Sequence, residues 1–268
     1  MISFPNAKIN IGLNVVSKRT DGYHDLETVF YPVKLSDVLE IVKSEKLSFS
    51  TSGIKVEGNP EDNLVLKAYH LLQTDFDLSP VKIHLHKVIP FGAGLGGGSA
   101  DGAFALKMLN GMFSLKLDRA RLKNYASKLG ADCPFFIENR PTFAHGIGDQ
   151  FMELEIDLTA YEIVIVKPEF SVSTAEAYRN IQPQKADFDL RELSHLPIDE
   201  WKHKVINDFE TSVFPDYPEI ADIKKKLYQC GAIYASMSGS GSAVFGIFAA
   251  VPEDTRRCFP GDYFVFVV

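Results

Sequence analysis

The stretch PFGAGLGGGSADG, residues 90–102, has glycine at positions 92, 94, 96, 97 and 98. Five glycines in seven positions are entropically costly in an ordered chain, so this backbone must bend sharply or approach another group closely. Residues 81–90 before it alternate polar and apolar side chains, as a half-buried strand does, and end at Pro90. Residues 99–113 after it have the apolar spacing of a helix. The sequence therefore predicts a strand, a glycine loop and a helix.

Several phosphate-binding motifs share this order, and the flanking residues distinguish them. A dinucleotide-binding fold needs a second strand that ends in an acidic residue about 20 positions later, but residues 115–129 have helical spacing. A P-loop needs a Gly-Lys pair, and a protein kinase needs V-A-I-K and H-R-D motifs; the sequence contains none of these. Main-chain N–H groups at a helix N-terminus still attract anions, so we expect this loop to bind a polyphosphate rather than form only a turn.

Composition excludes several classes of protein. The 268 residues are 46% hydrophobic and 24% charged, which is typical of a globular protein with a sizeable core. A net charge of −7 argues against a nucleic-acid partner, and no apolar run approaches the roughly 18 residues of a membrane helix. Cysteines 133, 230 and 258 are odd in number and far apart, which argues against a disulfide framework or a thiolate zinc site. With no signal-like pattern at the N-terminus, we expect a cytoplasmic protein.

The predicted elements mix strands and helices without a regular βα order, which favours an α+β fold. A helix is expected after Asp62 or Asn63, either of which can cap it, and another from Asp118 to Gly130. Residues 46–58 predict a hairpin around Thr51–Gly53. His84 and His86 lie on one predicted strand face, which we interpret as a solvated polar face rather than a metal pair. Other strands are expected at residues 7–16, on both sides of Gly146–Gly148, at 161–166, and in three segments after residue 232.

Three segments resemble the signatures of the GHMP kinases, the family of galactokinase, homoserine kinase and mevalonate kinase. They stand in the family's order, as PNAKIN at 5–10, the glycine loop at 90–100 and SGSGS at 238–242. Three further segments are similar to the branch that phosphorylates 4-diphosphocytidyl-2-C-methyl-D-erythritol: RTDGYHDL at 19–26, GADCPFF at 130–136 and NDFE at 207–210.

The resemblance implies a two-domain α+β GHMP kinase fold. Residues 1–155 are expected to form an ATP-binding domain like the second domain of ribosomal protein S5, and residues 156–268 a ferredoxin-like domain. The implied reaction is ATP-dependent phosphorylation of the 2-hydroxyl of that compound, a step of non-mevalonate isoprenoid precursor biosynthesis. Mg²⁺ is expected from the reaction class, without an assigned ligand. The oligomeric state is left open between monomer and homodimer.

The resemblance also implies site residues. Asp132 is the implied proton acceptor and Lys8 its cationic neighbour, although a helix cap and a surface lysine are the commoner interpretations of such residues alone. Asn10, two positions after Lys8, is expected on the same strand face. The implied ATP site comprises Pro90, Phe91, Gly92, Ala93, Gly94, Leu95, Gly96, Gly97, Gly98, Ser99, Ala100, Asn63 and Lys87.

The cytosine of the implied acceptor calls for an aromatic stack and polar contacts to its amide edge. The implied substrate-binding residues are Asn10, Tyr23, His24, Thr174 and Tyr178. For Tyr178, an ordinary aromatic of an amphipathic helix is an equal alternative. Two other functions stay open from the sequence: another GHMP kinase, of the mevalonate or homoserine type, and a non-catalytic nucleotide-binding module.

Overall fold

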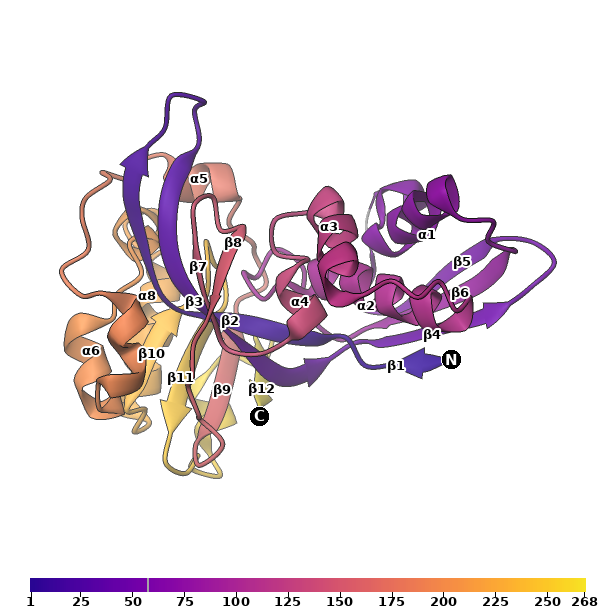
Figure 1. Ribbon diagram of the computed structural model, residues 1–268. Helices are drawn as coiled ribbons and strands as arrows, with labels where there is room; N and C mark the ends of the chain where they lie inside the picture. The colour runs from indigo at the N-terminus through magenta and orange to yellow at the C-terminus, as the bar shows by residue number, and fades with distance from the viewer. Residues whose placement is uncertain (57) are drawn as a thin grey trace. The chain divides into compact units, whose positions relative to one another are not determined.

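The computed structural model describes residues 1–56 and 58–268, which divide into two compact units (Figure 1). Both units are built from segments that lie far apart in the sequence. Unit 1 contains Met1–Ala7, Lys34–Pro90 and Gly96–Arg140. Unit 2 contains Lys8–Val33, Phe91–Leu95 and Pro141–Val268. The predicted division of the sequence into residues 1–155 and 156–268 stays a prediction.

The sheet of unit 1 has the strand order β1-β4-β6-β5. Its strands are β1 (Ile2–Ser3), β4 (Val38–Lys43), β5 (Ser48–Gly53) and β6 (Val81–Lys87). Strand β4 runs antiparallel to β6, whereas β5 runs parallel to β6 with Ser48 opposite Lys82. The predicted hairpin around Thr51–Gly53 is therefore wrong: β5 is a single strand whose partner lies beyond a helical connection.

Strand β6 shows why its sequence alternates. Its apolar side chains are buried, and the polar side chains between them face the other way. On that polar face, both ring nitrogens of His84 lie 2.9 Å from serine hydroxyls of β5, and His86 Nδ1 lies 2.9 Å from Ser52. His84 and His86 therefore lie on the polar face of β6, as the alternation of its sequence predicts.

Helices cover one face of this sheet (Figure 1). They are η1 (Pro60–Asp62), α1 (Leu64–Asp75), α2 (Gly97–Met112), α3 (Arg119–Leu129) and α4 (Phe135–Glu138). As predicted, Asn63 caps α1 by accepting from the Val65 N–H at 2.9 Å, and Asp118 caps α3. Gly102 lets α1 and α2 pack closely, since a Cβ there would lie 2.9 Å from Leu64 Cβ.

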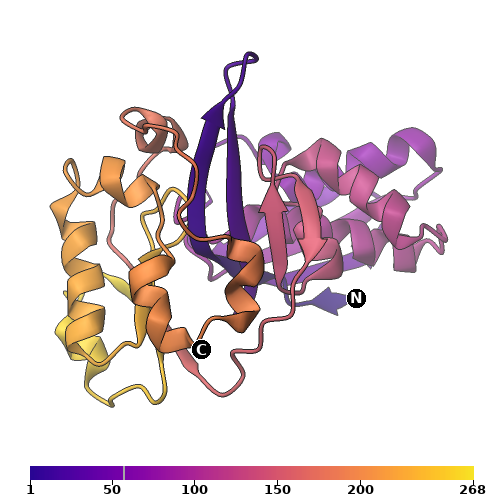
Figure 2. The ribbon, with the colours of Figure 1, turned by 60° about the vertical axis from the view of Figure 1, so that its left-hand side comes forward.

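Unit 2 contains two four-stranded sheets, and β2 and β3 also extend into unit 1. The first sheet, in the order β2-β3-β7-β8, includes a long hairpin drawn in indigo in Figure 2. Its strands are β2 (Asn6–Lys18), β3 (His24–Ser36), β7 (Thr142–His145) and β8 (Gln150–Glu153). The second sheet is antiparallel, in the order β10-β11-β9-β12. Its strands are β9 (Glu162–Lys167), β10 (Tyr234–Met237), β11 (Val244–Phe248) and β12 (Phe264–Val267).

The second sheet packs against α8 (Pro218–Gln229), which buries Ile220, Ile223 and Leu227 as their spacing predicts. Pro218 stands at the first position of α8, where a missing N–H is tolerated. The remaining helices are α5 (Thr174–Tyr178), η2 (Leu190–His195), η3 (Ile198–Glu200), α6 (Trp201–Lys204), α7 (Phe209–Val213) and η4 (Thr255–Cys258). Across the described residues, every helix is too short or too polar to cross a bilayer.

We predict that Leu227→Ala lowers the free energy of unfolding by about 2–5 kcal/mol, because it leaves a cavity in this core. Leu227 is fully buried, whereas Lys225 on the same helix is exposed. Lys225→Ala serves as the matched control and is expected to change stability by less than about 0.5 kcal/mol. Urea unfolding followed by circular dichroism measures both. Equal effects of the two substitutions would contradict the packing described here.

Candidate active site

The glycine loop contains a close main-chain contact. Gly94 has a φ of +73°, and a Cβ at this position would overlap the Ser238 carbonyl oxygen. Gly92 has a φ of +56°, and a Cβ there would lie 2.8 Å from the Ser171 hydroxyl. Both glycines belong to the Phe91–Leu95 segment of unit 2. The left-handed backbone and the absence of space explain why these two positions need glycine.

The SGSGS segment holds this loop by hydrogen bonds. Ser238 Oγ donates to the Gly94 carbonyl at 2.9 Å and accepts from the Asn10 N–H at 3.2 Å. The N–H groups of Ser242 and Ala243 donate to the carbonyls of Gly92 and Ala93 at 3.3 and 3.2 Å. The third signature therefore fixes the course of the second one, a role that its sequence left open.

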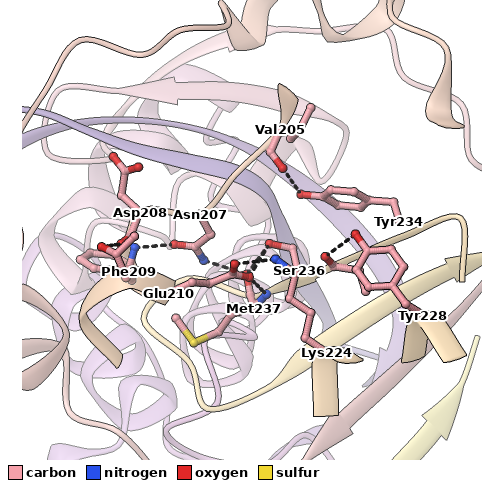
Figure 3. A network of polar contacts seen from close by, with 12 residues as sticks. Val205, Asn207, Asp208, Phe209, Glu210, Lys224, Tyr228, Tyr234, Ser236 and Met237 are labelled. Atoms are coloured by element: carbon pink, nitrogen blue, oxygen red, sulfur yellow. Dashed lines mark hydrogen bonds and ion pairs between the residues drawn. The ribbon is translucent and has the colours of Figure 1, made fainter. Parts of the chain in front are cut away.

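The NDFE segment in turn holds the SGSGS segment (Figure 3). Asn207 Nδ2 donates to the carbonyls of Met237 and Gly239 at 2.8 and 2.9 Å, one on each side of Ser238. Glu210 Oε1 accepts from the Met237 N–H at 2.9 Å, and its Oε2 is 2.5 Å from Lys224 Nζ of α8. Main-chain groups within the core are thus paired by side chains, which satisfies them away from water.

Helix α2 begins directly after the loop, in unit 1. Gly96, its N-cap, has a left-handed φ of +68° and carries no side chain that could cap the helix. The first N–H groups of a helix have no intrahelical partner, and the helix dipole places partial positive charge there. The start of α2 thus supplies donors that suit a phosphate group.

A buried ionic cluster lies beneath the start of α2. Lys87 is 1% exposed, and its Nζ is 2.5 Å from Asp37 Oδ2 and 2.7 Å from Asp101 Oδ2. Asp37 Oδ1 accepts from the N–H groups of Val88 and Ile89, so it also holds the chain that leads into the glycine loop. This geometry gives Lys87 a structural role and does not support its predicted contact with ATP.

Asp101 in this cluster has a pKa well above that of an ordinary aspartate. Burial raises the pKa of Asp101 to about 8, and the negative charge of Asp37 acts in the same direction, against the attraction of Lys87. Its Oδ1 is buried without a hydrogen-bond partner. One ammonium group facing two buried carboxyls is electrically balanced when one of the carboxyls carries a proton, so we assign that proton to Asp101.

Asp132 lies in the turn between α3 and α4 and is half-buried. The N-cap of α4 is Pro134, so Asp132 is not a helix cap. The next residue, Cys133, is fully buried, and burial raises the pKa of its thiol to about 12, while a hydrogen bond with Ser99 acts in the opposite direction. Ser99 stands in the first turn of α2, so its influence on the Cys133 thiol indicates that the Asp132 turn lies near the start of that helix within unit 1.

Lys8 lies on β2 and is not a surface lysine, since only 4% of it is exposed. Its Nζ donates to Asn10 Oδ1 at 2.6 Å and lies 4.7 Å from the centre of the Phe30 ring. The prediction that Lys8 and Asn10 share a strand face is confirmed. The Lys8 N–H also donates to the Leu95 carbonyl at 2.9 Å, which joins β2 to the end of the glycine loop in unit 2.

Two of the predicted substrate-binding residues, His24 and Tyr178, form an aromatic pair in unit 2. The rings of His24 and Tyr178 stack with centroids 4.8 Å apart and an interplanar angle of 17°. Phe209 meets Tyr178 edge-on at 4.7 Å, while Tyr23 is 63% exposed. Thr174 Oγ1 lies 3.4 Å from the hydroxyl of Ser240, so it sits beside the SGSGS segment.

The turn that carries Tyr23 and His24 is held by the Arg19 guanidinium, which pairs with the carboxylates of Asp21 and Asp25 at 2.8 and 3.0 Å. Its hydrogen bond lowers the pKa of Asp21 below its usual value. The sequence alone did not mark Asp37, the roles of Ser238 and Asp101, or Thr28, whose Oγ1 accepts from Asn10 Nδ2 at 3.0 Å. Ser238 and Asp101 stand inside recognised motifs, whereas nothing in the local sequence of Asp37 or Thr28 marks them.

Comparisons with known proteins identify the family of this chain. Residues 63–140 match the family described as "GHMP kinases N terminal domain", and residues 193–259 match the family described as "GHMP kinases C terminal". A protein of Bacteroides fragilis strain YCH46, named 4-diphosphocytidyl-2-C-methyl-D-erythritol kinase, is 55% identical over 263 residues, which cover 97% of this chain and 96% of that protein. The chain belongs to the GHMP kinase family.

Further comparisons show which GHMP kinases this chain resembles. A protein of Cytophaga hutchinsonii with the same name is 49% identical, over 94% of both chains. A crystal structure of 4-(cytidine 5'-diphospho)-2C-methyl-D-erythritol kinase has a TM-score of 0.83 and 30% identity, covering 100% of this chain and 98% of that one. The mevalonate kinase of Methanococcus jannaschii shares the fold, with a TM-score of 0.72 and 14% identity over 100% and 97% of the chains. The predicted two-domain α+β GHMP kinase fold is confirmed.

We predict that Asp101→Asn removes a pH dependence of stability. The folded state keeps the Asp101 proton up to a pKa of about 8, while the unfolded chain releases it near pH 4. Between these values the folded state binds more protons, so the wild type loses unfolding free energy as pH rises, by at most about 1.4 kcal/mol per pH unit. Urea unfolding at several pH values compares the two proteins.

Asp77→Asn, at an exposed position, is the control for this measurement and is expected to follow the wild type at every pH. A stability difference between wild type and Asp101→Asn that stays constant from about pH 5 to about pH 8 would contradict the assigned proton.

The two kinds of loop glycine should respond differently to alanine. Gly94→Ala is expected to cost at least about 1–3 kcal/mol of stability, because of its positive φ and its contact with Ser238. Gly98 has open space around its Cβ position and lies in α2, so Gly98→Ala is expected to be neutral or stabilising by up to about 1 kcal/mol. Thermal and urea unfolding test the pair. If both variants lose stability equally, the proposed close approach at Gly94 is wrong.

Proposed function

We propose that this GHMP kinase transfers the γ-phosphoryl group of ATP to the 2-hydroxyl of 4-diphosphocytidyl-2-C-methyl-D-erythritol, giving the 2-phosphate and ADP. The names of relatives at 49–55% identity support this choice of substrate. ATP as the co-substrate follows from the kinase family. The reaction belongs to non-mevalonate isoprenoid precursor biosynthesis.

The observation that carries the proposal is the position of the Asp132 turn beside the first turn of α2. A carboxylate there is suited to accept the proton of a hydroxyl that attacks a phosphate bound at the helix start. Lys8, buried and hydrogen-bonded to the end of the glycine loop, supplies a cation for the charge that develops on the transferred group. We therefore propose Asp132 as the general base and Lys8 as its electrostatic partner.

The ATP phosphates are proposed to lie on residues 90–100. The uncapped donors of α2 and the exposed backbone at Gly92 support this site. Asn63 remains a proposed neighbour of the adenine through its side-chain amide, since its Oδ1 is occupied in capping α1. Lys87 is not proposed as an ATP contact.

The cytosine is proposed to bind at the His24 and Tyr178 rings, with Tyr23 as a second stacking surface. The stack of His24 on Tyr178 supports this choice, because aromatic rings offer flat surfaces on which a base can stack. Phe209 supports Tyr178 from its edge and limits its rotation. Thr174 is proposed to contact the diphosphate, and Asn10 to orient the acceptor end of the substrate beside Lys8.

Mg²⁺ is expected in phosphoryl transfer because it bridges the phosphate oxygens of ATP. Within residues 1–56 and 58–268, no group of three or more His, Cys, Asp or Glu side chains is arranged to hold a metal ion.

The proposed partner is a small molecule, and a negative net charge of −7 disfavours binding to nucleic acid. We propose a cytoplasmic enzyme that acts as a monomer or homodimer without a membrane partner. Size-exclusion chromatography with light scattering decides between the two oligomeric states.

We predict that Asp132→Asn lowers kcat with the cytidyl substrate about 10²–10⁴-fold, because it removes the proton acceptor and keeps the shape of the side chain.

Tyr178→Ala is expected to raise KM for that substrate by about 5–150-fold, because it removes a stacked ring worth about 1–3 kcal/mol. ADP release measured with the cytidyl acceptor, mevalonate and homoserine gives both constants. Asp77→Asn is the surface control. Full activity of Asp132→Asn, or preference for mevalonate or homoserine, would refute the corresponding part of the proposal.

A further inference from the structure

Two of the three cysteines lie in contact although 28 positions separate them. The Cys230 thiol donates to Cys258 Sγ, with the two sulfur atoms 3.0 Å apart. Both residues are free thiols and both are partly exposed. We propose that Cys230 and Cys258 are a modification site, at which a peroxide or disulfide oxidant forms a reversible intramolecular disulfide. Their distance in the sequence had suggested the opposite.

The two thiols are held in place by their surroundings. Cys230 ends α8, and its N–H donates to the Lys226 carbonyl at 2.8 Å. Cys258 ends η4, which Arg256 ties to β12 by a 2.9 Å hydrogen bond to the Val265 carbonyl. Both cysteines pack against the same apolar core as α8 and β12. The sulfur atoms are therefore held 3.0 Å apart, within about 1 Å of the length of a disulfide bond.

The hydrogen bond orders the two steps. Cys230 already donates its proton toward Cys258, so a thiolate formed on Cys258 has a donor in place. Burial, followed by the neighbouring Cys258, raises the pKa of Cys230 to about 11, which keeps Cys230 protonated. Cys258 is therefore the thiol that meets the oxidant, and Cys230 is the resolving thiol.

With hydrogen peroxide the steps balance. The Cys258 thiolate attacks one peroxide oxygen, the O–O bond breaks, and Cys258 becomes a sulfenic acid with release of hydroxide. The Cys230 sulfur then attacks the Cys258 sulfur, the S–O bond breaks, and the Cys230 proton leaves with the hydroxyl group as water. Two thiols lose two electrons, and one peroxide becomes two water molecules. A dithiol reductant reverses the change by thiol–disulfide exchange.

The bond would close a loop that contains β10, the SGSGS segment and β11. Closing such a loop restricts the unfolded chain and stabilises the folded one, provided that the native geometry accepts the bond. Cys133 lies outside this loop, is fully buried and has a raised pKa, so it is a poor target for the same oxidant. The oxidised kinase should stay folded and should unfold at a higher temperature than the reduced kinase.

The test treats the purified full-length kinase with hydrogen peroxide or oxidised glutathione and then alkylates it under denaturing conditions. We expect a loss of two alkylated thiols, a cross-linked peptide pair containing Cys230 and Cys258, and reversal by dithiothreitol. We also expect the melting temperature to rise by roughly 5 °C on oxidation. Cys230→Ser and Cys258→Ser are each expected to abolish both the cross-link and the rise.

Three results would overturn the proposal. The first is full alkylation of all three cysteines after oxidation. The second is a sulfinic acid, a glutathione adduct or a cross-link between chains in place of the internal disulfide. The third is the same rise in melting temperature in a folded Cys230→Ser variant. Circular dichroism of each reduced variant establishes that it is folded before oxidation, so a missing cross-link is not confused with a misfolded protein.

Discussion

The contact between the Gly94 backbone and the Ser238 carbonyl is the constraint on which the site depends. A loop rich in glycine has many conformations of similar energy, so its own sequence does not select the one that suits a phosphate. Selection comes from outside, through the hydrogen bonds of Ser238, Ser242 and Ala243 to the loop carbonyls. These bonds use the carbonyl groups of the loop, so the bracing does not consume its N–H groups, which the proposed phosphate site requires.

The cluster of Lys87, Asp37 and Asp101 answers a different need. Burying three ionisable groups costs desolvation energy, which a single ion pair rarely recovers. Here Asp37 also accepts from two main-chain N–H groups, so the cluster fixes the strand end from which the loop departs. A balanced cluster adds little net charge beneath α2. The positive potential at the helix start is then set by the helix itself, where a phosphate would bind.

Local sequence predicted the elements whose cause is local. Asn63, Asp118 and Gly130 mark helix ends by capping chemistry, and the period of the apolar residues in α8 marks its buried face. The hairpin at Thr51–Gly53 failed because its turn residues do not reveal the partner strand, which lies beyond α1. Asp37 was invisible for the same reason: its partners at Lys87 and Val88 are about 50 positions away.

The candidate site divides in the same way. The glycine loop and Asn10 beside Lys8 were predicted, because motif spacing and strand period carry that information. The burial of Lys87 was not, since a lysine at a strand end looks the same whether it faces ATP or two carboxylates. Only the fold around Asp101 distinguishes these cases. Contact between Cys230 and Cys258 is equally non-local, because β10 and β11 lie between α8 and η4 in the sequence.

Ser238 explains how three distant signatures come to act together. One hydroxyl can donate and accept at the same time. Ser238 Oγ accepts from the N–H of Asn10, two positions after Lys8 in the first signature. The same hydroxyl donates to the carbonyl of Gly94 in the second signature. An alanine would lose both bonds, and a movement of either segment by about 1 Å would already matter for catalysis. The distance between the strand of Lys8 and the glycine loop is therefore held by the side chain of Ser238, which need not touch any substrate.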